Sequence, residues 1–301
     1  MASTRDIRRR IKSVKNTQQI TKAMKMVAAA KMRRAQEKVQ EARPYAAKIE
    51  EVVASVAKSS GGKHPMLVSR PVKKTGYIVL TADRGLAGSF NAQVIRLAVN
   101  ELANKSRDQY SLITIGRRGR DFFKKREYPM SGEVVGLPDF PNFADIKAIS
   151  EMVVNLYQDE VFDEVYLLYN EFINPIQQVP VMKKLLPLED LAKSEQKEAS
   201  YVPGGSSNKE NTGYKPSYEF EPSAEAVLDK LLPKFAETLI YSALLESKAS
   251  EQGARMTAMG NATDNASDMI DSLTLALNRA RQSAITLQIM EIVGGAEALN
   301  S

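Results

Sequence analysis

The 301-residue sequence contains no cysteine and no tryptophan, and it has a single histidine. The absence of cysteine excludes a disulfide framework, a cysteine-ligated metal site and a thiol nucleophile. The one histidine, His64, precedes Pro65 in a predicted loop, where a solvated side chain is favoured over a ligand or a base. The sequence therefore offers few of the side chains from which catalytic and metal sites are built.

Long hydrophobic runs are also missing. No apolar stretch approaches the roughly 18 residues of a membrane span, and the N-terminus lacks the apolar segment of a secretory signal. We therefore expect a soluble or peripheral protein. The apolar content of 43%, with charges of both signs, predicts an ordered globular core.

Positive charge is concentrated at the N-terminus. Residues 1–43 hold 13 Lys or Arg and 3 Asp or Glu, which gives this segment a charge of +10 against a total of +6 and leaves −4 for the rest. The basic segment is expected to face acidic surface. It contains no aromatic side chain for base stacking, so we predict no nucleic-acid partner.

Apolar residues at alternating spacings of four and three predict a coiled-coil helix over about residues 4–57. Pro44 lies inside this pattern, which resumes in phase after it, so a bend is expected there and not an end. Ile20, Met24 and Val27 form a second stripe displaced from the seam, and we predict that it faces a partner. The seam comprises Ile7, Ile11, Val14, Ala28, Met32, Ala35, Val39, Ala42, Ala46, Ile49, Val53 and Val56, with Gln18, Thr21 and Lys25 at intervening positions.

A second long helix is predicted from Pro222 to about Val293. The two helices are expected to pair antiparallel, with Ile11 and Val14 against about residues 273–287. Gly253 and Gly260 inside the second helix predict close packing or local pliability. Its seam comprises Ile270, Leu273, Leu277, Ala280, Ala284 and Leu287.

Between these helices, short apolar strands alternate with helices, which predicts an α/β domain with a largely parallel sheet. The polar segment at about 190–218 predicts a mobile surface loop. We divide the chain into an N-terminal coiled-coil helix (1–60), a central α/β domain (61–220) and a C-terminal coiled-coil helix (221–301). Strands are expected at 77–80, 111–115 and 164–169, and helices at 93–104, 119–125 and 146–157.

A glycine-rich segment at 85–89 follows a predicted strand and precedes a helix, where an α/β fold binds phosphate. It lacks the Gly-x-Gly-x-x-Gly spacing and the phosphate-loop lysine, so a structural turn is favoured. Asp83 and Arg84 have no histidine, thiol or paired carboxylate near them in sequence, and we predict no catalytic residue, cofactor or metal. Two alternatives stay open: a free nucleotide-binding α/β enzyme dimerised by its helices, and a coiled-coil nucleic-acid adaptor.

Several stretches resemble one family. The segments IRRRIKSVKNTQQITKAMKMVAAAKM at 7–32, ASEQGARMTAMGNATDNA at 249–266 and ARQSAITLQIMEIVGGAEAL at 280–299 are similar to the coiled-coil helices of the gamma subunit of F-type ATP synthases. TADRGLAGSFN at 81–91 and NEFIN at 170–174 resemble motifs of its α/β domain. The likeness covers almost the whole chain in the expected order.

The resemblance implies a long antiparallel coiled coil joined to a central Rossmann-like α/β domain. It also implies a noncatalytic rotor shaft that couples proton-driven rotation to ATP synthesis and regulates ATPase activity. The implied partners are the alpha and beta subunits of the catalytic ring, the epsilon subunit and the membrane ring of c subunits, at the cytoplasmic face of a bacterial cell membrane.

The resemblance and the stripe together nominate nine residues as contacts with the catalytic ring. One position departs from the family pattern, because Gln288 stands where an acidic residue is usual. The nine are Ile20, Met24, Val27, Arg255, Arg281, Gln282, Thr286, Gln288 and Glu291.

Overall fold

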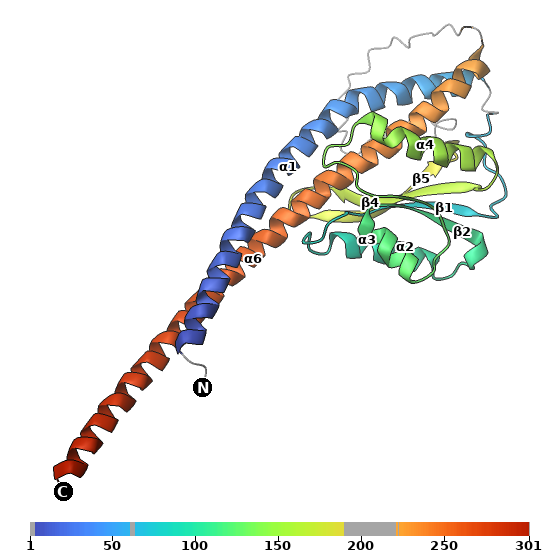
Figure 1. Cartoon of the computed structure of the whole chain (residues 1–301). Coiled ribbons are helices and arrows are strands. Elements are labelled where there is room, and N and C mark those ends of the chain that lie inside the picture. The colour runs from blue at the N-terminus through green and yellow to red at the C-terminus, as the bar shows by residue number, and fades with distance from the viewer. Residues whose placement is uncertain (1–3, 61–63, 190–220, 222, 301) are drawn as a thin grey trace. The chain divides into compact units, whose positions relative to one another are not determined.

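The computed structural model describes residues 4–60, 64–189, 221 and 223–300, with side chains described as far as residue 295. The chain forms two compact units, one from residues up to Ala28 and from Met256 onward, the other from Ala29–Arg255. Helices α1 (Thr4–Ser59) and α6 (Ala224–Asn300) contribute to both (Figure 1). The predicted mobile loop at 190–218 lies outside the described residues.

The first unit is an antiparallel helix pair, as predicted. The Thr263 hydroxyl donates to the Thr21 hydroxyl at 2.8 Å, and the Gln18 amide donates to the Ser267 hydroxyl at 2.7 Å. Residues later in α6 therefore lie against residues earlier in α1. Gln18 and Thr21 are thus hydrogen-bonded across the helix pair, which makes these polar seam residues compatible with a coiled-coil interface, whereas Lys25 is exposed.

The predicted seam of α6 is only partly correct. Residues 270, 273, 277 and 280 are half-buried, whereas Ala284 and Leu287 are exposed. The observed register places Ile11 opposite about residue 274 and Val14 opposite about residue 270, a turn short of the range expected for Val14. The described part of α1 begins at Thr4. The periodic pattern of α6 therefore extends beyond the last residues of α6 that this part of α1 can contact.

The second unit contains a five-stranded sheet in the order β3-β2-β1-β4-β5. Strands β1 (Thr75–Leu80), β2 (Tyr110–Ile115), β3 (Met130–Val134) and β4 (Glu164–Phe172) pair in parallel. Strand β5 (Gln178–Leu186) pairs antiparallel with β4. The sheet is largely parallel, as predicted, and its two edge strands were not predicted from the sequence.

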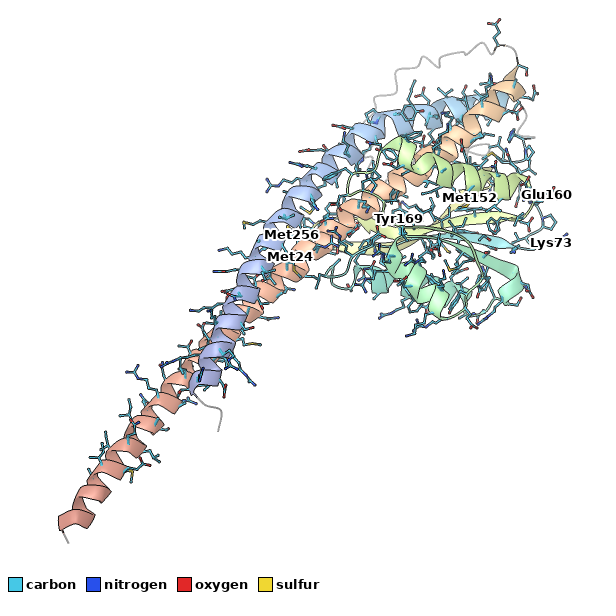
Figure 2. All side chains as sticks on the ribbon, in the orientation of Figure 1. Met24, Lys73, Met152, Glu160, Tyr169 and Met256 are labelled. Atoms are coloured by element: carbon cyan, nitrogen blue, oxygen red, sulfur yellow. The ribbon has the colours of Figure 1, made fainter. Side chains whose placement is uncertain are left out.

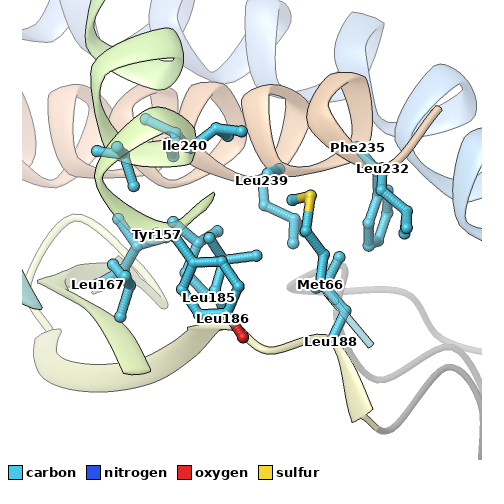
Figure 3. Packing of buried hydrophobic residues seen from close by; sticks show 14 of the residues in the cluster. Met66, Tyr157, Leu167, Leu185, Leu186, Leu188, Leu232, Phe235, Leu239 and Ile240 are labelled. Carbon is cyan, nitrogen blue, oxygen red and sulfur yellow. The ribbon is translucent and has the colours of Figure 1, made fainter. Parts of the chain in front are cut away.

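Helices cover both faces of this sheet (Figure 1). One face carries α2 (Phe90–Leu102) and α3 (Arg117–Lys125), with the short helix η1 (Arg107–Gln109) before β2. The other carries α4 (Phe143–Gln158) together with residues 49–57 of α1 and 228–244 of α6. In Figure 3, Leu239 of α6 lies beside Met66, and both belong to the same buried core as Phe235 and Tyr157. The long helices are therefore part of the domain core in this unit.

The structure bears on the expectations for two residues, Pro44 and His64. Helix α1 continues through Pro44, so the proline does not end it. The prediction that His64 is a solvated loop residue was wrong. Its side chain is only 11% exposed, and its Nε2 lies 3.0 Å from Asp229 Oδ1. The backbone N–H of Met66 donates to His64 Nδ1 at 3.1 Å. His64 therefore holds the segment after α1 against α6.

Candidate partner-contact surfaces

Doubly wound sheets bind ligands at the point where the strand order reverses. In this sheet that point lies between β1 and β4. In this chain α6 packs over that position. The Ser250 hydroxyl donates to the Asn170 carbonyl at 2.9 Å, and the Asn170 amide donates to the Phe90 carbonyl at 3.0 Å. Ala254 packs with Ala82 and Phe90 in a small buried cluster. The crevice is filled by the chain's own helix.

Arg255 belongs to the same attachment. Its guanidinium donates to Glu251 Oε1 at 2.7 Å and to the Gly85 carbonyl at 3.3 Å, while Lys248 Nζ lies 3.8 Å from Glu251 Oε2. The Arg255 side chain is 11% exposed. This predicted partner-contact residue therefore ties α6 to the loop after β1. Its contact with a partner stays a prediction.

Gly253 explains how α6 comes so close to the sheet. A Cβ built at this position would lie 3.3 Å from Phe172 Cε2 and 3.5 Å from Pro175 Cα. The close packing predicted for this glycine is confirmed. At Gly260, by contrast, the nearest atoms belong to the flexible stem of Lys25, at 3.5 Å.

The loop after β1 is a structural turn. Asp83 accepts the backbone N–H of Arg117 at 2.9 Å and of Gly136 at 3.0 Å, so its carboxylate joins three segments at the sheet edge. Leu86 and Gly88 have φ of 62° and 54°, which form the turn itself. The favoured interpretation of Gly85–Ser89 as a turn is confirmed, and Asp83 has a structural role.

Within the parts of the chain that the structure describes, no three His, Cys, Asp or Glu side chains cluster as metal ligands would. Among the described helices, none has the length and apolar content needed to cross a bilayer.

The stripe on α1 lies off the seam, as the sequence indicated. Ile20 and Val27 are 60% and 53% exposed, and Met24, labelled in Figure 2, is half-buried. Met26, which the sequence did not single out, is 61% exposed but lies on a different face of α1 from this stripe. Apolar side chains grouped on a helix surface indicate a protein partner, whose identity no contact within this chain specifies.

The C-terminal part of α6 presents the second surface. All five residues nominated here are exposed, and the Thr286 hydroxyl donates to the Gln282 carbonyl of its own helix at 3.0 Å. Exposed apolar residues lie between them; the sequence did not nominate these, and it assigned one of them, Leu287, to the seam. The nominated residues are Arg281, Gln282, Thr286, Gln288 and Glu291, and the exposed apolar ones are Ile285, Leu287, Ile289, Met290, Ile292 and Val293.

Basic side chains surround the start of α1. Arg8, Arg9, Arg10, Lys12 and Lys15 are all exposed. Exposed cations steer association with an oppositely charged partner, and contact of the basic segment with acidic surface stays a prediction.

Comparison with known proteins finds that the chain as a whole is similar to members of one family. A family model described as ATP synthase matches residues 3–299. An ATP synthase gamma chain of Brevibacillus brevis is 58% identical over 297 residues, covering 98% of each chain, and one of Heliobacterium modesticaldum is 53% identical over 300 residues, covering 99% of this chain and 100% of the relative. A chain in the central stalk/c-ring structure of the Tetrahymena thermophila mitochondrial ATP synthase matches with a TM-score of 0.60 and 29% identity, covering 81% of this chain and 99% of the other.

Proposed function

Because this chain belongs to the gamma-chain family of ATP synthases, we propose that its two exposed apolar surfaces are where it contacts the catalytic ring. The chain is a noncatalytic subunit of the central stalk, and it couples rotation to ATP synthesis in other subunits. The first surface, the α1 stripe, is Ile20, Met24 and Val27. The second, the α6 end, is the exposed part of α6 from Arg281 to Val293.

One observation carries this proposal. Six apolar side chains between residues 285 and 293 are 44–72% exposed. They lie on the part of α6 that extends beyond the described part of α1. A soluble monomer rarely leaves such a contiguous apolar surface in water. The ring of alpha and beta subunits is the partner that covers it.

Polar residues on the same surfaces supply the angular asymmetry that a rotor needs. On the surface called the α6 end, Arg281 is the first residue and Glu291 lies near the last, and the two carry opposite charges. Gln288 lies between them. Each rotor angle presents a different set of these groups to a given catalytic subunit, so it favours a different conformation of that subunit. Gln288 makes a neutral contact where the family pattern has an acidic one.

The α/β unit is assigned to the remaining partners, the epsilon subunit and the c ring. The c ring accompanies the central stalk in the Tetrahymena structure. We place the assembly at the cytoplasmic face of the bacterial cell membrane, an assignment supported by the two bacterial relatives.

Site-specific crosslinking tests the contact surfaces, because the chain has no native cysteine to interfere. Gln288→Cys and Ile20→Cys, each carrying a photoactivatable maleimide, are reconstituted with alpha and beta subunits and irradiated. We expect adducts with alpha or beta from both positions. Asp108→Cys, an exposed position in the α/β unit, gives the baseline. Adduct yields no higher than this baseline would contradict the assignment.

A further inference from the structure

A cavity of about 440 Å³ lies within the α/β unit, between α1, the end of β4 and α6. Val39, Phe172 and Ala249 provide apolar walls, and Arg43 and Glu246 contribute charged groups. A cavity of this size gives neighbouring side chains room to change rotamer without displacing the backbone.

Two polar atoms on opposite walls lack hydrogen-bond partners. Arg43 Nε, from α1, and Glu246 Oε2, from α6, are both buried and unpartnered. Glu246 is only 4% exposed. The Tyr169 hydroxyl hydrogen-bonds the Glu246 carboxyl, but with Oε2 unpartnered the ionised group remains costly to bury, and a guanidinium facing the same cavity is the group best suited to compensate it.

The geometry points to a proton-controlled contact between the two long helices, in which loss of the Glu246 proton brings the Arg43 guanidinium into an ion pair with Glu246 across the cavity. In the protonated state the carboxyl is neutral and the two groups stay apart, as the structure has them. In the ionised state the pair ties α1 to α6. This device goes beyond the proposed ring contacts and does not depend on them.

The surroundings of Glu246 set the pH at which the contact changes. Burial raises its pKa to about 7, and the like charge of Glu171 acts in the same direction. Lys183 of β5, the Tyr169 hydroxyl of β4 and Arg43 of α1 lower it. Lys183 is engaged with Glu171 at 3.2 Å, so Arg43 is the cation of this group that is free to move.

The pairing predicts opposite effects of the neighbouring charges. Arg43→Gln removes the compensating cation and raises the pKa of Glu246. Glu171→Gln removes a like charge and lowers it. If Arg43 does not move, Arg43→Gln should shift the pKa of Glu246 less than Glu171→Gln does. The reason is that Arg43 has the smallest of the named effects on this pKa in the present geometry.

Hydrogen exchange of the Arg43 Nε–H, observed by NMR in the full chain labelled with ¹⁵N-arginine, tests the proposal directly. The signal is assigned from its loss in Arg43→Lys. We expect its protection factor, corrected for base catalysis, to rise at least tenfold between pH 6 and pH 8. A protection factor that stays constant over this range would overturn the proposal with no variant required.

Two variants show whether Glu246 is responsible. Glu246→Gln keeps the size of the side chain but cannot ionise, so the protection factor should lose its pH dependence. Glu41→Gln removes an exposed carboxylate on α1 that pairs with Lys38, and it should leave the dependence unchanged. A tenfold rise that persists in Glu246→Gln would assign the titration to another group and refute the contact.

Discussion

The Arg255 guanidinium lies 2.7 Å from the carboxylate of Glu251, one turn earlier on α6, and both side chains are about nine-tenths buried. The same guanidinium reaches the Gly85 carbonyl in the loop after β1. This pair fixes α6 over the crevice in which related folds bind their ligands.

Arg255→Ala tests this attachment. It leaves Glu251 buried with only Lys248 at 3.8 Å, and we expect a loss of about 3 kcal/mol in the free energy of unfolding. Urea denaturation followed by circular dichroism measures it. Lys38→Ala breaks the exposed pair with Glu41 and should cause no measurable change. Equal effects of the two variants would show that the buried pair is not an anchor.

Glu246 gives the stability of the α/β unit a distinctive pH dependence. Its pKa is about 7 in the folded chain against 4.5 in the unfolded one, so between these values the folded state binds more protons. Stability therefore falls as pH rises through this window, by at most about 3 kcal/mol from this group, and by less as the Arg43 ion pair stabilises the carboxylate. The difference in unfolding free energy between wild type and Glu246→Gln, measured from pH 4.5 to 8, should show this slope. A difference that does not vary with pH would contradict it.

Two glycines with positive φ separate backbone strain from steric overlap. Gly116 has φ of 100°, and a Cβ there would collide with the Thr81 carbonyl, whereas Gly136 has φ of 78° and no atom within 4 Å of such a Cβ. Gly116→Ala should destabilise the chain by at least about 3 kcal/mol and Gly136→Ala by about 1 kcal/mol. Thermal unfolding of both variants provides the comparison. Similar losses of stability in the two variants would mean that the positive φ alone, and not steric overlap with Thr81, determines the destabilisation.

Engineered disulfides check the helix register. The hydroxyls of Thr21 and Thr263 are 2.8 Å apart, a separation from which cysteines at the two positions can bridge. Oxidation of the Thr21→Cys, Thr263→Cys chain should give a bridged species with altered mobility on a denaturing gel. Pairing Thr21→Cys with Thr274→Cys, about three turns further along α6, should not. Efficient bridging of the second pair would show a different register.

The sequence predicted the elements whose apolar pattern is decided locally. Strands β1, β2 and β4 are apolar runs, and the long helices carry a sustained seam, so each was recognised. Strand β5 was missed because Pro180, Lys183 and Lys184 interrupt its apolar run, although such residues are tolerated on an edge strand. Gly132 obscured β3 in the same way.

The contact surfaces were predictable only in part. Periodicity placed Ile20 and Val27 off the seam, and their exposure agrees. The same periodicity wrongly assigned Leu287 to the seam, because spacing along α6 carries no information about how far α1 extends beside it. The anchoring role of Arg255 depends on a carbonyl 170 residues away in the chain. Such a contact follows from the tertiary fold and has no local signal.

Met24→Lys distinguishes a coupling shaft from an inert stalk. Met24 is half-buried on α1 beside the exposed Ile20, so a lysine there can place its ammonium in solvent and leave the helix pair nearly as stable. The new cation would attract acidic surface on a catalytic subunit, and one added pair at reduced dielectric contributes about 1–3 kcal/mol. Each rotary step must break that pair again. We therefore expect a complex that assembles and hydrolyses ATP but couples poorly to proton transport, with a raised activation barrier for synthesis.

Met26→Lys adds the same charge on a different face of α1 and should couple normally. If synthesis rate, proton pumping and temperature dependence of the Met24→Lys complex match the wild type, the α1 stripe does not face the catalytic ring.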